Sequence, residues 1–232
     1  MSLSALVRAG VCIFGVSLAA CGGEDEPAAG SGDRADAGGT AGSPAAGGGD
    51  EVDRFSFFVT SWAALQRLSK SPNGFGGDLR YGEADGLRGA DEICREIAEA
   101  SLAGSGKKTW RAFLSVTKGA DGDPVNAIDR VGEGPWYDRQ GRLLAQNKTA
   151  LAMVRPQGAD AAIINDFPNE DGIPNHAPDG MLVDNHDMLT GTNETRKLFS
   201  TDWKYTCHDW TVTPCVRKHS AMSPSASALQ AP

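Results

Sequence analysis

The sequence lacks any apolar run of about 20 residues, the length that a membrane-spanning helix needs, so a membrane-spanning protein is excluded. It has only 4 histidines, and it contains no Gly-x-Ser-x-Gly element, phosphate-binding loop, dinucleotide fingerprint or His-Glu-x-x-His. Aromatic residues are scarce in its first 50 positions: all 5 Trp and all 3 Tyr lie beyond them. These absences remove the common catalytic signatures and place the folded core in the later part of the chain.

The N-terminus has the pattern of a secretory leader. Arg8 provides one positive charge, and a short apolar segment follows over residues 9–18. This leader, residues 1–20, ends in Leu-Ala-Ala before Cys21, which resembles the lipobox of bacterial lipoproteins. That resemblance implies that Cys21 is diacylated and becomes the new N-terminus, and that Cys12 is discarded. The alternative is an ordinary cleavable signal with an incidental cysteine.

Residues 21–53 have the composition of a flexible tether. The stretch 22–50 contains 10 Gly and 7 Ala with no aromatic residue, and it cannot bury enough apolar surface to offset its ordering entropy. Seven acids against Arg34 give residues 22–52 a net charge near −6, out of −8 for the whole chain. The acidity therefore belongs mainly to the tether, and it argues against nucleic-acid binding. Gly22, in place of the Asp that retains lipoproteins in the inner membrane, favours the outer membrane or cell surface.

We expect one folded domain over residues 54–219, followed by a disordered tail at 220–232. Alternation predicts a strand at 54–60 and another at 109–116. Between them, a helix is expected to open at Gly86, with two acids (Asp91 and Glu92) in its first turn. Its apolar stripe should face the core through positions i, i+3, i+4 and i+7, which are Ala90, Ile93, Cys94 and Ile97.

Later segments are shorter. Residues 125–131 form an element of either type, and 134–145 predict a hairpin with its turn at 138–141. Residues 157–187 form a long loop, and 204–211 are expected to be extended. On the strand at 109–116, one face should carry Trp110, Ala112, Leu114 and Val116.

Several motifs together resemble the endostatin domain of basement-membrane collagens. The segments 86–98 (GLRGADEICREIA), 102–115 (LAGSGKKTWRAFLS) and 186–211 carry the likeness, and 134–138 (GPWYD) resembles related bacterial lipoproteins. The motif positions are Gly89, Ala90, Asp91, Trp110, Phe113, Trp136 and Trp210. The resemblance implies an α+β, C-type-lectin-like fold with a distorted antiparallel sheet and two helices, in which the first and last strands pair.

The same resemblance implies two nested disulfides, which the cysteine count does not match. After processing, Cys94, Cys207 and Cys215 would remain, so at least one thiol would lack a partner within the chain. The family pairs the helix cysteine with one on the last strand, whereas Cys207 could reach Cys215. We therefore expect the sequence to diverge from the family near Val212, by truncation, frameshift or a replaced tail, so that the final strand is missing.

No catalytic constellation stands out. The loop residues His176, Asp179, Asp184 and His186 are candidate ligands for zinc or calcium. The alternative, a solvated loop without a cofactor, is favoured by the Pro and Gly around them. Cys207-His208-Asp209 suggests a Cys–His nucleophile, but neighbours on an extended segment point to opposite faces, which favours a structural cysteine.

The tryptophans are candidate platforms for stacking a ligand, although those in strand patterns belong more readily to the core. They are Trp62, Trp110, Trp136, Trp203 and Trp210.

The sequence predicts a non-enzymatic surface lipoprotein that presents a lectin-like domain for binding or adhesion. Its partners would be the membrane, through the lipid, and a glycan or an extracellular-matrix or protein ligand. One alternative is a metal-dependent protein or enzyme that uses the loop at 160–187. Another is a truncated paralogue without a function.

Overall fold

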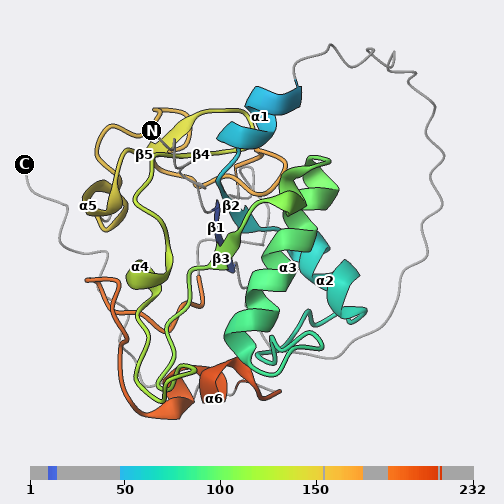
Figure 1. Cartoon of the computed structure of the whole chain (residues 1–232), viewed down its shortest axis with the longest axis vertical. Coiled ribbons are helices and arrows are strands. Elements are labelled where there is room, and N and C mark those ends of the chain that lie inside the picture. The colour runs from blue at the N-terminus through green and yellow to red at the C-terminus, as the bar shows by residue number, and fades with distance from the viewer. Residues whose placement is uncertain (1–9, 15–47, 154, 175–187, 214, 216–232) are drawn as a thin grey trace, which may run out of the picture.

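A computed structural model describes residues 10–14, 48–153, 155–174, 188–213 and 215. The described part has a mixed α/β architecture, with helices packed around two small sheets (Figure 1). None of its helices is long and apolar enough to cross a membrane. The predicted lipidation site Cys21, the loop at 175–187 and the tail at 220–232 lie outside the described residues.

The larger sheet has three strands in the order β2–β1–β3. Strand β1 (Gly10–Phe14) lies in the middle, between β2 (Phe57–Thr60) and β3 (Trp110–Ala112), and it is parallel to both (Figure 1). The expected distorted antiparallel sheet is therefore wrong for this sheet, because its central strand comes from the N-terminus and runs in the same direction as its neighbours. The first predicted strand, which we expected to lack its partner strand, pairs with β1 instead.

Helix α3 (Gly86–Ser101) packs along this sheet (Figure 1). Its predicted apolar stripe is confirmed, since all four side chains are fully buried. The placement of Asp91 and Glu92 in the first turn is wrong. The helix begins at Gly86, as expected, and its N-cap is Asp85, whose carboxylate accepts a hydrogen bond from the Arg88 backbone N–H at 2.8 Å. Asp91 and Glu92 therefore lie in the second turn.

The other helical segments are short. Helix α2 (Trp62–Ser69) follows β2 and is capped by Ser61. The remaining segments are α1 (Gly48–Arg54), α4 (Ala127–Arg130), α5 (Lys148–Leu151), α6 (Cys207–Trp210) and the 3₁₀ turns η1 (Ser105–Lys107) and η2 (Trp203–Tyr205). Helix α1 starts inside the range expected for the tether, and its Glu51 forms an ion pair with Arg139. The acidic end of the tether is therefore attached to the domain.

The predicted hairpin is confirmed as the antiparallel pair β4 (Trp136–Tyr137) and β5 (Leu143–Ala145). Its turn is built around the fully buried Asp138. The carboxylate of Asp138 accepts hydrogen bonds from the backbone N–H of Arg142 at 2.8 Å and from its Nε at 2.7 Å. The pairing with Arg142 explains how the Asp138 carboxylate can be buried while the rest of the turn reaches the surface.

Two hydrophobic clusters flank the three-stranded sheet. The α3 side includes Phe55 and the predicted strand face of Trp110, Ala112, Leu114 and Val116, all of them buried. The other side, which includes Phe113 and Trp136, lies toward the hairpin. Side chains of β1 enter both clusters, so this strand belongs to the centre of the core.

Two disulfide bonds are present in the described residues. Cys12 of β1 is bonded to Cys94 of α3, and Cys207 is bonded to Cys215. Cys94 thus pairs with Cys12, which lies in the predicted leader. The unpaired thiol was expected for a chain processed at Cys21, and it stays a prediction.

The predicted extended segment at 204–211 is also wrong. Residues 207–210 have positive φ angles of 51–63° and form a tight left-handed turn that the disulfide closes.

Candidate functional site

Three large aromatic side chains are exposed on one short segment. Phe199, Trp203 and Tyr205 are 51%, 52% and 40% exposed, and we call them the aromatic patch. The rings of Phe199 and Tyr205 pack edge-to-face with centroids 5.0 Å apart, and Trp203 contacts the His208 ring. By contrast, Trp110, Trp136 and Trp210 are buried. Of these four tryptophans, Trp203 alone is placed to stack on a ligand.

A compact turn structure holds the aromatic patch. Asp202 caps η2 by accepting a hydrogen bond from the Lys204 backbone N–H at 3.1 Å. The segment then continues into α6, where the buried Trp210 donates its indole N–H to the Ser115 carbonyl at 3.0 Å. The Cys207–Cys215 disulfide closes the same turn. A rigid support of this kind lowers the entropy lost when a ligand is bound.

The rim of the aromatic patch carries a charged pair. Lys204 Nζ lies 2.5 Å from an Asp202 carboxylate oxygen and 5.0 Å from the centre of the Tyr205 ring. The hydrogen bond between the pair raises the pKa of Lys204 and lowers the pKa of Asp202, so both stay charged at neutral pH. The patch therefore combines apolar ring faces with a polar, hydrogen-bonding edge.

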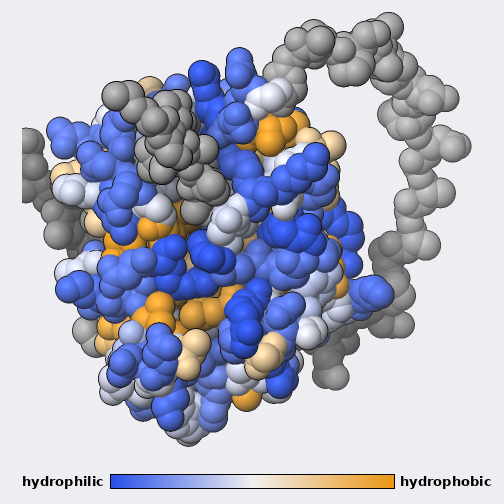
Figure 2. Space-filling view, in the orientation of Figure 1, coloured by the Kyte–Doolittle hydropathy of each residue, from blue (hydrophilic) through white to orange (hydrophobic). Residues whose placement is uncertain are grey.

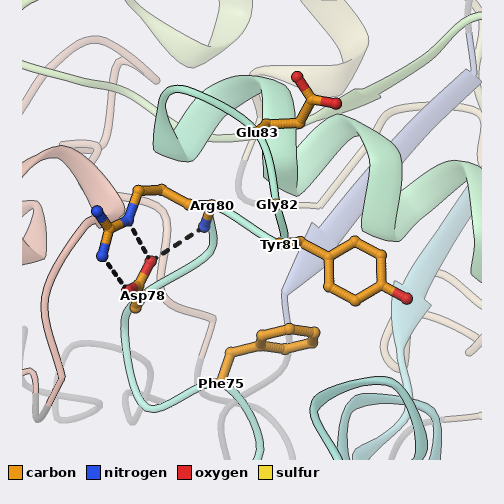
Figure 3. Close-up of a pocket in the computed structure, with 6 residues that line it drawn as sticks. All are labelled: Phe75, Asp78, Arg80, Tyr81, Gly82 and Glu83. Carbon is orange, nitrogen blue, oxygen red and sulfur yellow. Dashed lines mark hydrogen bonds and ion pairs between the residues drawn. The ribbon is translucent and has the colours of Figure 1, made fainter.

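A second candidate is an open pocket of about 430 Å³ on the loop that follows α2 (Figure 3). The rings of Phe75 and Tyr81 pack edge-to-face at 5.6 Å on one side, and Asp78 and Arg80 pair on the other. Burial raises the pKa of Tyr81, whose hydroxyl donates to Glu96 at 2.9 Å. The Phe75 and Tyr81 rings are less exposed than the three rings of the aromatic patch, so this pocket offers a ligand less aromatic surface.

One face of the molecule can be judged by its hydropathy. On the side drawn in Figure 2, hydrophobic residues are visible in separate areas between hydrophilic ones. Such scattered exposure is ordinary for a soluble domain. The candidate sites are therefore particular groups of side chains.

The predicted motif residues lie in the core. Gly89 and Ala90 are buried on α3, and the carboxylate of Asp91 bonds to Arg111 and Arg130. Phe113 is also buried. These positions hold α3 against β3, and none of them lines the aromatic patch or the pocket.

The predicted metal ligands His176, Asp179, Asp184 and His186 lie outside the described residues. Within the described ranges, no group of three or more His, Cys, Asp or Glu side chains is arranged to hold a metal ion. In the described part of the loop, Glu170 binds protein instead: its carboxylate accepts hydrogen bonds from the backbone N–H and hydroxyl of Ser61 at 2.9 and 2.5 Å.

The Cys–His nucleophile is not assembled. Cys207 is disulfide-bonded and offers no thiolate. The carboxylate of Asp209 accepts hydrogen bonds from the backbone N–H and hydroxyl of Thr117 at 2.6 and 2.8 Å. The left-handed turn, and not the alternation of an extended strand, is what directs these side chains.

The aromatic patch was not predicted as a group. Trp203 was a candidate platform, but Phe199 and Tyr205 were not considered with it. The usable signal was that Trp203 and Tyr205 flank Lys204 in a segment whose apolar residues follow no strand or helix period.

Comparison of the chain with models of protein families, with curated proteins and with solved structures gives no significant match.

Proposed function

We propose that this protein is an exported lipoprotein, anchored through Cys21 to the bacterial outer membrane or cell surface, whose domain binds a glycan with the aromatic patch. The Leu-Ala-Ala-Cys sequence and the Gly-rich acidic spacer support the anchor. A second acyl chain makes such attachment stable, because each buried CH₂ contributes about 0.8 kcal/mol.

We propose for the domain a C-type-lectin-like, endostatin-like fold. In support, the Gly-Ala-Asp segment opens a helix whose Cys94 is disulfide-bonded to a core strand. The Arg-Ala-Phe-Leu-Ser segment contributes β3, and the Tyr-Cys-x-x-Trp segment contributes a disulfide and a buried Trp210. These contacts support the proposal, although Cys94 is bonded to Cys12 and not to a cysteine on a last strand.

The observation that carries the binding role is the exposure of three aromatic rings within seven residues on a rigid turn. Burying rings of this size is a main source of binding energy, and Trp and Tyr dominate binding hot spots. A sugar ring offers apolar C–H faces to such rings and hydroxyl groups to a charged rim such as Asp202 and Lys204. A glycan therefore matches both parts of the patch.

A glycan array with the purified full chain tests this function. Trp203→Ala removes the largest ring of the patch and should weaken binding of any glycan found by at least about tenfold, as for a hot-spot residue. Ile173→Ala is the matched control, because Ile173 is similarly exposed (57%) and lies outside the patch. Equal binding by both variants, or an array with no signal above background, would overturn the glycan function.

The anchor has a separate test. In a bacterial host that processes lipoproteins, the intact mass of the membrane-bound protein should correspond to a chain that begins at a lipidated Cys21. Cys21→Ser should move the protein out of the detergent phase. Recovery of the unlipidated wild type with its first 20 residues would refute the anchor.

A further inference from the structure

The central strand of the sheet consists of residues that maturation at Cys21 would remove. Strand β1 spans Gly10–Phe14, within the predicted leader. Its neighbours β2 and β3 each bond to β1 in the sheet. A lipidated chain that starts at Cys21 has both neighbours but not the strand between them.

The place of β1 is closely defined by backbone hydrogen bonds on both sides. The N–H of Gly10 donates to the Thr109 carbonyl at 2.8 Å, and the N–H of Val11 donates to the Ser56 carbonyl at 2.8 Å. The Cys12 carbonyl accepts from the Phe113 N–H at 2.8 Å. Ser56 and Phe113 are buried, so removing β1 would leave the Ser56 carbonyl and the Phe113 N–H without these partners, which is costly.

Both faces of β1 are buried, and in different clusters. Val11 and Ile13 pack on the hairpin side, whereas Cys12 and Phe14 pack on the α3 side. The position between β2 and β3 therefore requires apolar side chains at four successive residues of the strand that fills it. At its start it selects glycine, because a Cβ on Gly10 would lie 2.5 Å from the Trp110 ring.

Cys94 adds a covalent element to this place. It is fully buried on α3 and is disulfide-bonded to the middle residue of β1, with the two Cα atoms 5.8 Å apart. In a processed chain, the sulfur of Cys94 would face the vacant strand position. It would be set to capture a cysteine presented there.

We infer that the place between β2 and β3 is a strand-acceptor site. In the lipidated protein it takes, from a partner protein, an apolar strand with Gly at its first position, Cys at its third and a large apolar residue at its fifth. This inference rests on the proposed processing at Cys21. A second processed copy is not the donor, since it has lost the same residues. Main-chain hydrogen bonds supply affinity, and the alternating pockets supply selectivity.

The covalent step is a thiol–disulfide exchange. The Cys94 thiolate attacks a small-molecule disulfide and releases one thiolate; the strand's cysteine thiolate then attacks the mixed disulfide and releases the second. The two protein thiols lose two protons and two electrons, and the disulfide oxidant is reduced to two thiols.

The test begins from the folded full chain. Cys21→Ser blocks processing and removes a competing thiol, and a specific protease site is inserted between Gly39 and Thr40. After cleavage without reductant, we expect fragment 1–39 to remain attached through Cys12–Cys94 and to be released by reduction. Release without reductant would overturn the inference.

The reduced, cleaved protein is separated from fragment 1–39 and mixed with a labelled peptide of residues 8–16 and oxidised glutathione. Mass spectrometry should locate the peptide on Cys94, at least tenfold above a scrambled peptide with Cys at the same position. The matching peptide should also slow proteolysis of 40–232 at least tenfold. Equal capture of both peptides, capture on Cys207 or Cys215 instead, or no capture and no protection would each overturn the acceptor site.

The mass of the membrane-bound protein and the peptide capture distinguish failure of the lipoprotein proposal from failure of the acceptor site. If the mass of the membrane-bound wild type shows an uncleaved leader, the lipoprotein proposal fails, and the strand place is filled within the chain. If Cys21 is lipidated but the peptide is not captured selectively, the acceptor site alone fails.

Discussion

Asp91 lies at the centre of a buried ion-pair cluster, and replacing it with Asn should destabilise the domain strongly. Its carboxylate accepts hydrogen bonds from Arg111 Nη1 at 2.8 Å, from Arg130 Nη2 at 2.9 Å and from the Ala112 backbone N–H at 2.8 Å. The cluster joins α3 to β3 and α4. Asp91→Asn keeps the shape, but it removes the negative charge and places amide hydrogens where donors already converge.

The ion pairs of Asp91 with Arg111 and with Arg130 contribute unequally to the free energy of unfolding. Arg111 is 42% exposed, so its charge is solvated without Asp91 and its pairing contributes at most about 1 kcal/mol. The Arg130 side chain is only 10% exposed, and without Asp91 its charge stays buried with no acid against it. Breaking a buried pair from one side costs about 3–5 kcal/mol, and we expect a loss of that size.

Urea unfolding followed by tryptophan fluorescence measures this loss. With a slope of about 2 kcal/mol per molar urea, the midpoint should fall by roughly 2 M. Glu92→Gln is the matched control: it is the next residue of α3, and its pair with Arg95 is 32–41% exposed, so its loss should stay below about 1 kcal/mol. If Asp91→Asn costs no more than Glu92→Gln, the reasoning about the buried cluster is refuted.

Three further predictions follow from the packing and the charges. Gly89→Ala would place a Cβ 2.0 Å from the Arg80 carbonyl oxygen, and overpacking of this kind should cost about 3 kcal/mol in urea unfolding; an unchanged midpoint would contradict it. Cys12→Ser in the uncleaved chain removes the disulfide to Cys94, which has a sequence separation of 82 and contributes about 4.5 kcal/mol through chain entropy. The unfolding temperature should therefore fall well below that of the wild type, and coincident unfolding curves would argue against this disulfide. The hydrogen bond from Arg80 lowers the pKa of Asp78 in the folded state. The stabilisation that this gives is present above the ordinary carboxyl pKa near 4 and is lost as the pH falls through the lowered pKa. The unfolding free energies of wild type and Asp78→Asn, measured from pH 2 to 7, should therefore differ above about pH 4 and converge below the lowered pKa.

Local patterns predicted the elements whose signals lie within the element itself. The apolar stripe of α3 repeats with the helical period, and one buried face is enough to specify it. The hairpin β4–β5 follows from a turn sequence between two short apolar segments. The start of α3 at Gly86 agrees with the prediction, but Asp91 and Glu92 lie beyond its first turn, because Asp85 caps the helix through a side-chain hydrogen bond.

The three-stranded sheet could not be predicted in the same way. An apolar segment such as Gly10–Phe14 has the same composition whether it is a leader or a buried parallel strand. Strand pairings across more than 40 residues of sequence place it between β2 and β3, and the disulfide to Cys94 on α3 fixes it there. The aromatic patch was missed for a similar reason, since exposure of Phe199 and Tyr205 depends on which neighbours the turn at 207–210 brings close.

The cysteines link these two parts of the molecule to different fates of the leader. In the uncleaved chain Cys12 and Cys94 pair. In a chain processed as we propose, Cys21 would carry the anchor and Cys94 would lose its partner. The Cys207–Cys215 disulfide is closed within residues that processing does not touch. The support of the aromatic patch therefore has its own cross-link, whereas the central sheet depends on β1, which processing at Cys21 would remove. Glycan binding and strand capture should accordingly respond to different substitutions, Trp203→Ala for the first and Cys94→Ser for the second.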